Sequence, residues 1–187
     1  MRLVFSLGLA LALGACGFGD TAERFAVPVA DITERERISY GSVEVAEVSL
    51  PTYAALEEIF VAGEDGALQS DVAALWADDP TRAVTLELSR ALATITGARV
   101  APAPWPFEAF PEVRVDARIE EMLADADGVF RLSGQYFVAP RDETRRDRTG
   151  VFSLATPWDV TKGAAGIAEA RGRLVRDLAL EIAQRGL

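Results

Sequence analysis

One stretch of the sequence, VRVDARIE, leaves little choice of structure because apolar and charged residues alternate along it. Its apolar positions are Val113, Val115, Ala117 and Ile119. A period of two is typical of a strand with one buried face and one solvated face. A turn sequence follows at 125–128, and an apolar run follows the turn at 129–138. The pattern therefore predicts an antiparallel hairpin.

Two segments carry the spacing of helices. In the first, Asp79 can cap the helix, Pro80 suits its first position, and Gly97 ends it. Its apolar face comprises Val84, Leu88, Ala91, Leu92 and Ile95. The second helix is expected within 163–186, where Gly186 ends it and the buried face comprises Ile167, Leu174, Leu178 and Ile182.

Shorter apolar runs indicate further strands. The expected elements are an extended segment at Phe25–Val29, a strand within Ile38–Pro51, a hairpin turning at Gly63–Gly66, and a strand at 151–155 after a turn at 140–150. The apolar parity shifts within Ile38–Pro51, which indicates a bulge or a strand covered on both faces. Ala101–Pro111 holds four prolines and is expected to be irregular. Two helices with a mixed, largely antiparallel sheet predict a single α/β domain.

The N-terminus has the features of a secretory signal. A basic start is followed by the apolar run Leu3–Ala15, which is shorter than the roughly 20 residues of a membrane-spanning helix. Cys16, the only cysteine, follows small residues, and Leu-Gly-Ala-Cys resembles the lipobox of bacterial lipoproteins. That resemblance implies a signal peptide at 1–15, a lipid-carrying Cys16 with palmitate among its acyl chains, a tether at 16–24 and a domain at 25–187. An ordinary signal peptide with an incidental cysteine is the alternative.

Composition excludes several classes of function. Loss of Arg2 with the signal leaves 18 basic residues against 29 acidic ones, a balance that repels nucleic acid and bare anionic lipid. The chain has no histidine, which excludes the usual Ser-His-Asp and Cys-His catalysis. Histidine and thiolate zinc sites are excluded in the same way. We therefore expect no metal, no cofactor and no disulfide.

Three segments, in order, carry a family resemblance. They are Val43–Val61 with its LPTY sequence, Leu75–Val100 with LWADDP, and Val113–Val138 with SGQY, and RFAVPV precedes them. Together with the lipobox they resemble the ABC-type transport auxiliary lipoproteins, the family of the membrane-integrity-associated transporter subunit also called paraquat-inducible protein C. The resemblance covers nearly all of the chain that follows the signal.

The resemblance implies a lipoprotein of the outer membrane that faces the periplasm, and Gly17 after the lipid cysteine resembles the outer-membrane sorting pattern. It implies as partners an MCE-domain transporter protein and its ABC permease, which move lipids between the two membranes. A ring-shaped partner of this kind makes a homo-oligomer plausible. The implied fold is a three-layer α/β/α domain with a mixed sheet, similar to the anticodon-binding domain.

The candidate contact residues lie in the proline-rich stretch. Trp105, Phe107 and Phe110 can form an exposed patch for a partner or a membrane, or they can fold back as a lid over the sheet. Tyr53 and Trp76 are expected to pack in the core. The clustered arginines of the 140–150 turn form either a solvated tip or a docking point for acidic groups: Arg141, Arg145, Arg146 and Arg148.

The resemblance implies a non-enzymatic outer-membrane subunit that docks an MCE-type lipid transporter and supports membrane integrity, and the absence of histidine agrees with a role without catalysis. One alternative is an independent lipid- or ligand-binding periplasmic lipoprotein, which predicts a large apolar pocket. Another is a carboxylate-dependent hydrolase, which predicts two acids from distant segments in one cleft. Adjacent acids such as Glu57-Glu58, Asp78-Asp79 and Glu120-Glu121 are poor candidates for such a pair, because neighbours on a strand point to opposite faces.

The lipid anchor predicts the behaviour of one substitution. Each buried methylene contributes about 0.8 kcal/mol to membrane binding, and two or more acyl chains hold a protein stably. Cys16→Ser should therefore move the protein from the membrane fraction to the soluble periplasmic fraction, measured by fractionation and immunoblotting. A Cys16→Ser protein that stays in membranes would contradict the lipoprotein interpretation.

Overall fold

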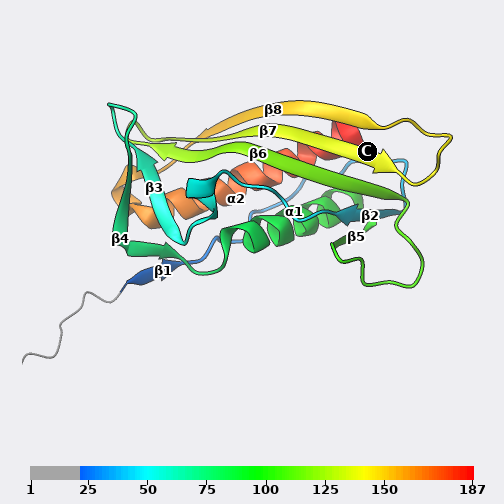
Figure 1. Ribbon diagram of the computed structural model, residues 1–187, viewed down its shortest axis with the longest axis horizontal. Helices are drawn as coiled ribbons and strands as arrows, with labels where there is room; N and C mark the ends of the chain where they lie inside the picture. The colour runs from blue at the N-terminus through cyan, green and yellow to red at the C-terminus, as the bar shows by residue number, and fades with distance from the viewer. Residues whose placement is uncertain (1–21) are drawn as a thin grey trace, which may run out of the picture.

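The computed structural model describes residues 22–187, and three long strands form the largest part of its sheet. They are β6 (Val113–Asp125), β7 (Val129–Pro140) and β8 (Arg148–Pro157). β7 pairs antiparallel with both neighbours, so the predicted hairpin is confirmed (Figure 1). Cys16, the signal peptide at 1–15 and most of the tether at 16–24 lie outside the described residues.

The other edge of β6 is shared by several short segments. β2 (Ser42–Val45) runs parallel to the start of β6, and β3 (Glu58–Ala62) runs parallel to its end. Between them the chain continues along β6, where the amide of Ala46 donates to Val115 O and the amide of Ile119 donates to Ser49 O. The parity shift in Ile38–Pro51 thus marks the end of β2, a strand whose residues 43–45 are all buried.

The remaining strands extend the sheet beyond these segments. β4 (Leu68–Trp76) pairs antiparallel with β3, β1 (Glu23–Phe25) pairs parallel with β4, and β5 (Arg99–Pro102) pairs parallel with β2. The eight strands therefore form one mixed sheet, which confirms the predicted type of sheet. The prediction that Ala101–Pro111 is irregular was wrong for its first two residues, which belong to β5. Pro102 ends an edge strand, a position where a missing N–H is tolerated.

Both predicted helices are confirmed, as α1 (Pro80–Thr96) and α2 (Ala164–Glu181). The Asp79 carboxylate accepts from the amide of Arg82 at 2.8 Å, and Gly97 ends α1 with φ 67°. α2 continues as a wider helical turn over Ile182–Gly186. Short 3-10 helices occupy Thr52–Ala55 and Val160–Lys162. No helix in residues 22–187 is both long and apolar enough to cross a bilayer.

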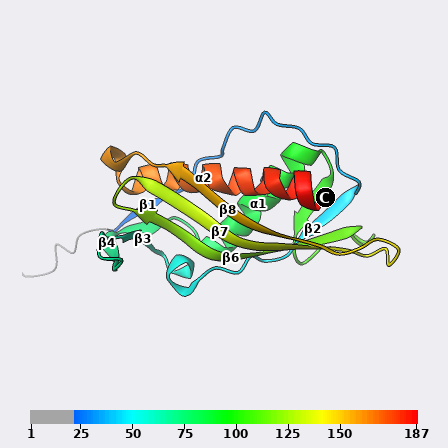
Figure 2. The same cartoon turned by 90° about the horizontal axis from the view of Figure 1, so that it is seen from above.

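The layers differ from the order that the resemblance implied. α1 and α2 pack against each other and lie on the same face of the sheet (Figure 2). The third layer is the extended segment 26–41, here called the strap, which crosses the outer side of the helices. The α/β class with two main helices is therefore confirmed, but the order is sheet, helices, strap.

Glycine explains the SGQY sequence of β7. The pairing of β6 with β7 shifts register between Ile119 and Glu121, opposite Gly134. Gly134 has a φ of 155°, and a Cβ on it would overlap the carbonyl oxygen of Arg118. Two residues later, the Tyr136 ring lies over Gly150, its register partner on β8. Both glycines are thus required by a close approach across the sheet.

Gly134→Ala should lower the free energy of unfolding by about 1–3 kcal/mol, because the added methyl forces β6 and β7 apart. Urea unfolding followed by circular dichroism measures this loss. The control is Ser133→Ala, which loses only a 3.3 Å hydrogen bond to Glu121 and should cost about 1 kcal/mol or less. Equal stabilities of the wild type and Gly134→Ala would contradict this account of the register shift.

Candidate functional site

Three segments meet at the end of the sheet farthest from β1 (Figure 1). They are the β5–β6 loop 103–112, the β7–β8 connection 141–147, and residues 39–41 at the end of the strap; together they are called the end surface. The Glu112 side chain joins them, because its Oε2 accepts from the amide of Gly41 at 3.0 Å. Its carbonyl accepts from the amide of Arg141 at 2.9 Å, and Arg145 Nη1 donates to Ser39 O at 3.1 Å.

The aromatic residues of the loop stand largely in solvent. Trp105 is half-buried, and its Nε1 donates to Ala109 O at 2.6 Å. Its ring contacts Phe107 edge-on at 5.0 Å between centroids. Phe107 is 45% exposed and Phe110 is 75% exposed. The alternative of a lid folded over the sheet therefore does not describe these two phenylalanines.

Each exposed ring is paired with an arginine. Arg99 lies 5.3 Å from the centroid of Phe107, and Arg141 lies 4.5 Å from that of Phe110. Such cation–π contacts contribute about 0.5–1 kcal/mol each at exposed sites. They hold each guanidinium group over its ring, so each pair presents apolar surface and hydrogen-bond donors side by side.

A hollow of about 430 Å³ lies between the loop and the connection. It is lined by Tyr40, Phe110, Pro111, Glu112, Arg141, Asp142 and Arg145. Arg145 stacks on Tyr40 at 4.7 Å, so the arginines of the turn are not only a solvated tip. Hydrogen bonds from Thr144 lower the pKa of Asp142, which therefore stays ionised at neutral pH. No motif or periodicity near Arg99 or Tyr40 indicated their roles.

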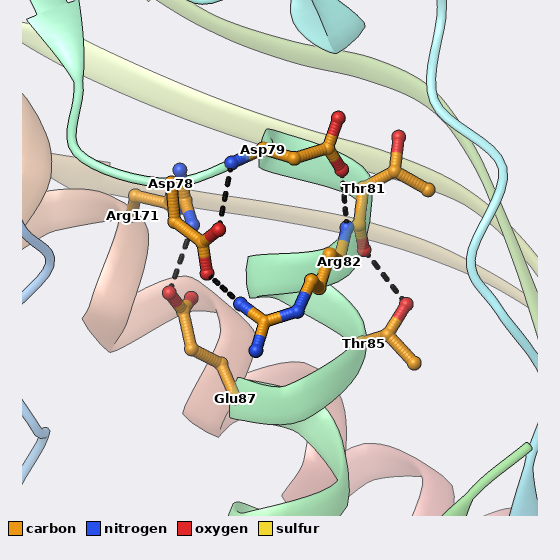
Figure 3. A network of polar contacts seen from close by, with 7 residues as sticks. All are labelled: Asp78, Asp79, Thr81, Arg82, Thr85, Glu87 and Arg171. Carbon is orange, nitrogen blue, oxygen red and sulfur yellow. Dashed lines mark hydrogen bonds and ion pairs between the residues drawn. The ribbon is translucent and has the colours of Figure 1, made fainter.

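A second cluster lies inside the molecule, where α1, α2 and β4 meet (Figure 3). Arg171 on α2 is 1% exposed, and its Nη2 donates to Glu87 Oε1 on α1 at 2.8 Å. Its guanidinium lies 4.5 Å from the Trp76 ring, so the packing role expected for Trp76 is confirmed. The apolar pattern did not identify Arg171 as a buried residue, although it follows Ile167 by four residues and so lies on the buried face of α2.

The ion pair is not fully satisfied by hydrogen bonds. Within the described residues, Glu87 Oε2 and Arg171 Nε are buried and have no partner. Burial raises the pKa of Glu87, and the opposing charge of Arg171 offsets part of that rise. Since an unpaired buried charge is costly, each partner of this pair depends on the other.

Asp78 and Asp79, which lie beside this cluster, bind groups at the start of α1. The Asp78 carboxylate accepts from the amide of Asp79 at 2.9 Å and forms an ion pair with Arg82. Asp79 caps the helix, and one turn later Thr85 Oγ1 donates to Thr81 O at 2.7 Å (Figure 3). These carboxylates therefore have structural partners and do not converge as an acid–base pair.

The cavities beside this cluster are small. One of about 150 Å³ lies between the strap and the two helices, and one of about 180 Å³ adjoins Arg171, Glu87 and Trp76. Pockets for small molecules usually measure about 300–1,000 Å³. In residues 22–187 no group of three or more histidine, cysteine or acidic side chains is placed to hold a metal ion.

The geometry defines a class of protein: a single α/β domain with a mixed sheet, two packed helices and exposed aromatic–arginine pairs at one end. The family model of the ABC-type transport auxiliary lipoprotein component matches residues 26–183. The chain therefore belongs to the ABC-type transport auxiliary lipoprotein family, as the sequence motifs predicted. A search of curated proteins found no match.

Two of the solved structures that align with this chain share its fold. An uncharacterized protein aligns with a TM-score of 0.70 and 16% identity over 88% of this chain and 97% of its own. A DUF330-family protein from Xanthomonas campestris aligns with a TM-score of 0.65 and 17% identity over 88% of this chain and 96% of its own. A PelC dodecamer from Paraburkholderia phytofirmans is more distant, with a TM-score of 0.43 and 12% identity over 89% and 95% of the two chains.

The buried ion pair predicts a non-additive pair of substitutions. Arg171→Met leaves the Glu87 carboxylate buried without its partner and should lower the free energy of unfolding by about 3–5 kcal/mol. Arg171→Met combined with Glu87→Leu removes both charges and should be more stable than Arg171→Met alone. Urea unfolding of both single variants and the double variant measures the coupling. Strict additivity of the two effects would contradict the account of this pair.

Proposed function

We propose that this chain is a non-enzymatic subunit of an MCE-type system for intermembrane lipid transport. In this proposal Cys16 carries the lipid that anchors the protein to the outer membrane, on its periplasmic side. The end surface then binds the MCE-domain transporter, which works with its membrane permease. The protein would support envelope integrity by holding the transporter at the outer membrane.

The observation that carries the proposal is the position of the exposed aromatic–arginine pairs. Phe107 with Arg99 and Phe110 with Arg141 lie at the end of the domain opposite β1, where the chain enters the fold. Aromatic residues and arginine are enriched in the centres of protein interfaces. A domain tethered at its β1 end can therefore present this surface to a partner without obstruction from its own anchor.

The dimensions of the cavities support docking over lipid carriage. The alternative of a lipid-binding lipoprotein predicts a large apolar pocket. The two cavities beside the strap hold about 150 and 180 Å³, too little for a diacyl lipid. The hollow of about 430 Å³ at the end surface is larger, but two arginines and two acids are among the residues that line it, so it is not an apolar pocket. A hydrolase needs two converging acids from distant segments, and Asp78 and Asp79 serve α1 and its ion pairs instead.

The test is capture of partners from crosslinked envelopes. Leu187 is buried and accepts a hydrogen bond from the amide of Ser39, so the affinity tag belongs in the exposed turn at 64–66 between β3 and β4. Mass spectrometry of the eluate should identify an MCE-domain protein and its permease. Phe107→Ala combined with Phe110→Ala should reduce their recovery about tenfold, an effect typical of interface hot spots.

The matched control is Leu68→Ala combined with Val72→Ala, which removes two exposed apolar side chains of β4 at the other end of the domain. Both double variants should unfold within about 1 kcal/mol of the wild type, because the altered side chains are exposed. Wild-type recovery by the Phe107/Phe110 variant would reject the end surface as the docking site. Absence of MCE proteins from every eluate, with lipid extracted from the purified protein, would favour the lipid-binding alternative.

A further inference from the structure

β8 is a long strand with one unpaired edge. It pairs with β7 over ten consecutive residues, and within the described chain no other strand pairs with it. Figure 1 shows it along one long side of the molecule. The sheet's other outermost strands are short, since β1 has three residues and β5 has four and ends in a proline. β8 is therefore the longest continuously paired edge strand of this sheet in residues 22–187.

The geometry of the pairing indicates which backbone groups face outward. The amide of Trp158 donates to Gly128 O at 2.8 Å, so this pair is hydrogen-bonded. Antiparallel pairs alternate between hydrogen-bonded and non-hydrogen-bonded positions. The N–H and C=O groups that point away from β7 are therefore those of Thr149, Val151, Ser153 and Ala155. Their side chains are exposed, and Val151 is 75% exposed.

The usual protections of a sheet edge are missing here. Natural edge strands carry charged side chains, prolines or bulges that prevent the addition of another strand. Residues 149–157 contain no charge, and their only proline is the last residue of the strand. The register between β7 and β8 runs without a shift from Val138 to Val129. The unprotected part spans about 20 Å, the length of a strand of about six residues.

Positive charge stands at both ends of this uncharged edge. The segment 145–148 contains three arginines and one aspartate at the start of β8. At the other end, Arg173 of α2 donates to Pro157 O at 2.6 Å and to Thr156 Oγ1 at 3.4 Å. A segment that lies along β8 therefore meets arginine at each of its ends.

We propose that β8 binds an extended segment of another protein, which joins the sheet as an additional strand. The segment is uncharged over about six residues, so that its main chain pairs with residues 149–155, and it carries acidic residues at both ends. The edge of β8 at 149–155 lies outside the end surface, and the two proposed surfaces share only residues 145–147, so hydrogen exchange at Val151 and Ser153 tests this proposal separately from the docking function.

A second copy of this chain fits the edge less well. Two β8 strands that pair antiparallel through their outward groups, with Thr149 opposite Ala155, place Arg148 of each copy beside Thr156 of the other, which Arg173 contacts. Like charges would then face each other at both ends of the pairing, which is destabilising.

The test uses the full chain purified from envelopes and the synthetic peptide Glu-Glu-Thr-Val-Thr-Val-Thr-Val-Glu-Glu. Amide hydrogen exchange is measured residue by residue with and without the peptide. At saturation, the outward amides of Val151 and Ser153 should exchange at least about tenfold more slowly, because they gain hydrogen bonds. The same peptide with lysine in place of glutamate should bind about fivefold more weakly.

Two variants separate strand addition from other binding. Ser153→Pro removes an outward N–H without removing a bond to β7 and should abolish protection, whereas Ser153→Ala should retain it. Val151→Asp combined with Ala155→Asp changes only exposed side chains and should repel the peptide even if Ser153→Pro fails to fold. Val72→Asp, on the exposed surface of β4, is the control for added charge.

The outcomes are distinct. Protection of Val151 and Ser153 by the acidic peptide, lost in the β8 variants and kept in the controls, supports the proposal. The absence of protection at millimolar concentrations of the acidic peptide overturns the proposal. Equal affinities for the acidic and the lysine peptide overturn the part of the proposal that places acidic residues at the ends of the bound segment. Protection that appears without peptide and grows with protein concentration would show that a second copy occupies the edge, and this also overturns the proposal.

Discussion

β6 has to satisfy the hydrogen bonds of its backbone along two edges at once, and the rest of the domain is arranged around that requirement. One edge is filled by β7 in a continuous antiparallel pairing with one register shift. The other is filled in succession by β2, by residues 46–49 and by β3. Because β2 and β3 each carry further strands outward, the sheet divides into two short halves beyond β6. The end surface belongs to one half, and β1 belongs to the other.

The sequence pattern was sufficient to predict the elements that are formed by residues close together in the chain, namely the helices and the hairpin. The hairpin of β6 and β7 follows from an alternation of period two, and α1 follows from Asp79, Pro80 and Gly97, whose capping roles are all observed. The parallel pairings could not be predicted in this way. They join segments more than fifty residues apart, as Val43 and Val113 do, and nothing near either residue specifies the other.

The same distinction applies to the candidate sites. The loop with Trp105, Phe107 and Phe110 stands out in the sequence because aromatic residues and prolines gather there. Its arginine partners Arg99 and Arg141 come from other elements, so only the fold reveals the pairs. Arg171 was detectable in principle from its place on the apolar face of α2. Its burial depends on Glu87 and Trp76, which the tertiary structure alone brings to it.

The strap gives the domain a mechanical property. It begins at β1, which has only three residues of parallel pairing, and runs over the helices to β2. Its polar contacts with the helices are few, and the strongest are those of Glu36 with Ile95 O and Gln184. Tension applied at the N-terminal side would therefore peel β1 and then the strap from the surface, while the pairing of β2 with β6 lies deep in the sheet and resists. Sixteen released residues span at most about 50 Å at about 3.3 Å each, so the anchor point can move relative to a core that stays folded.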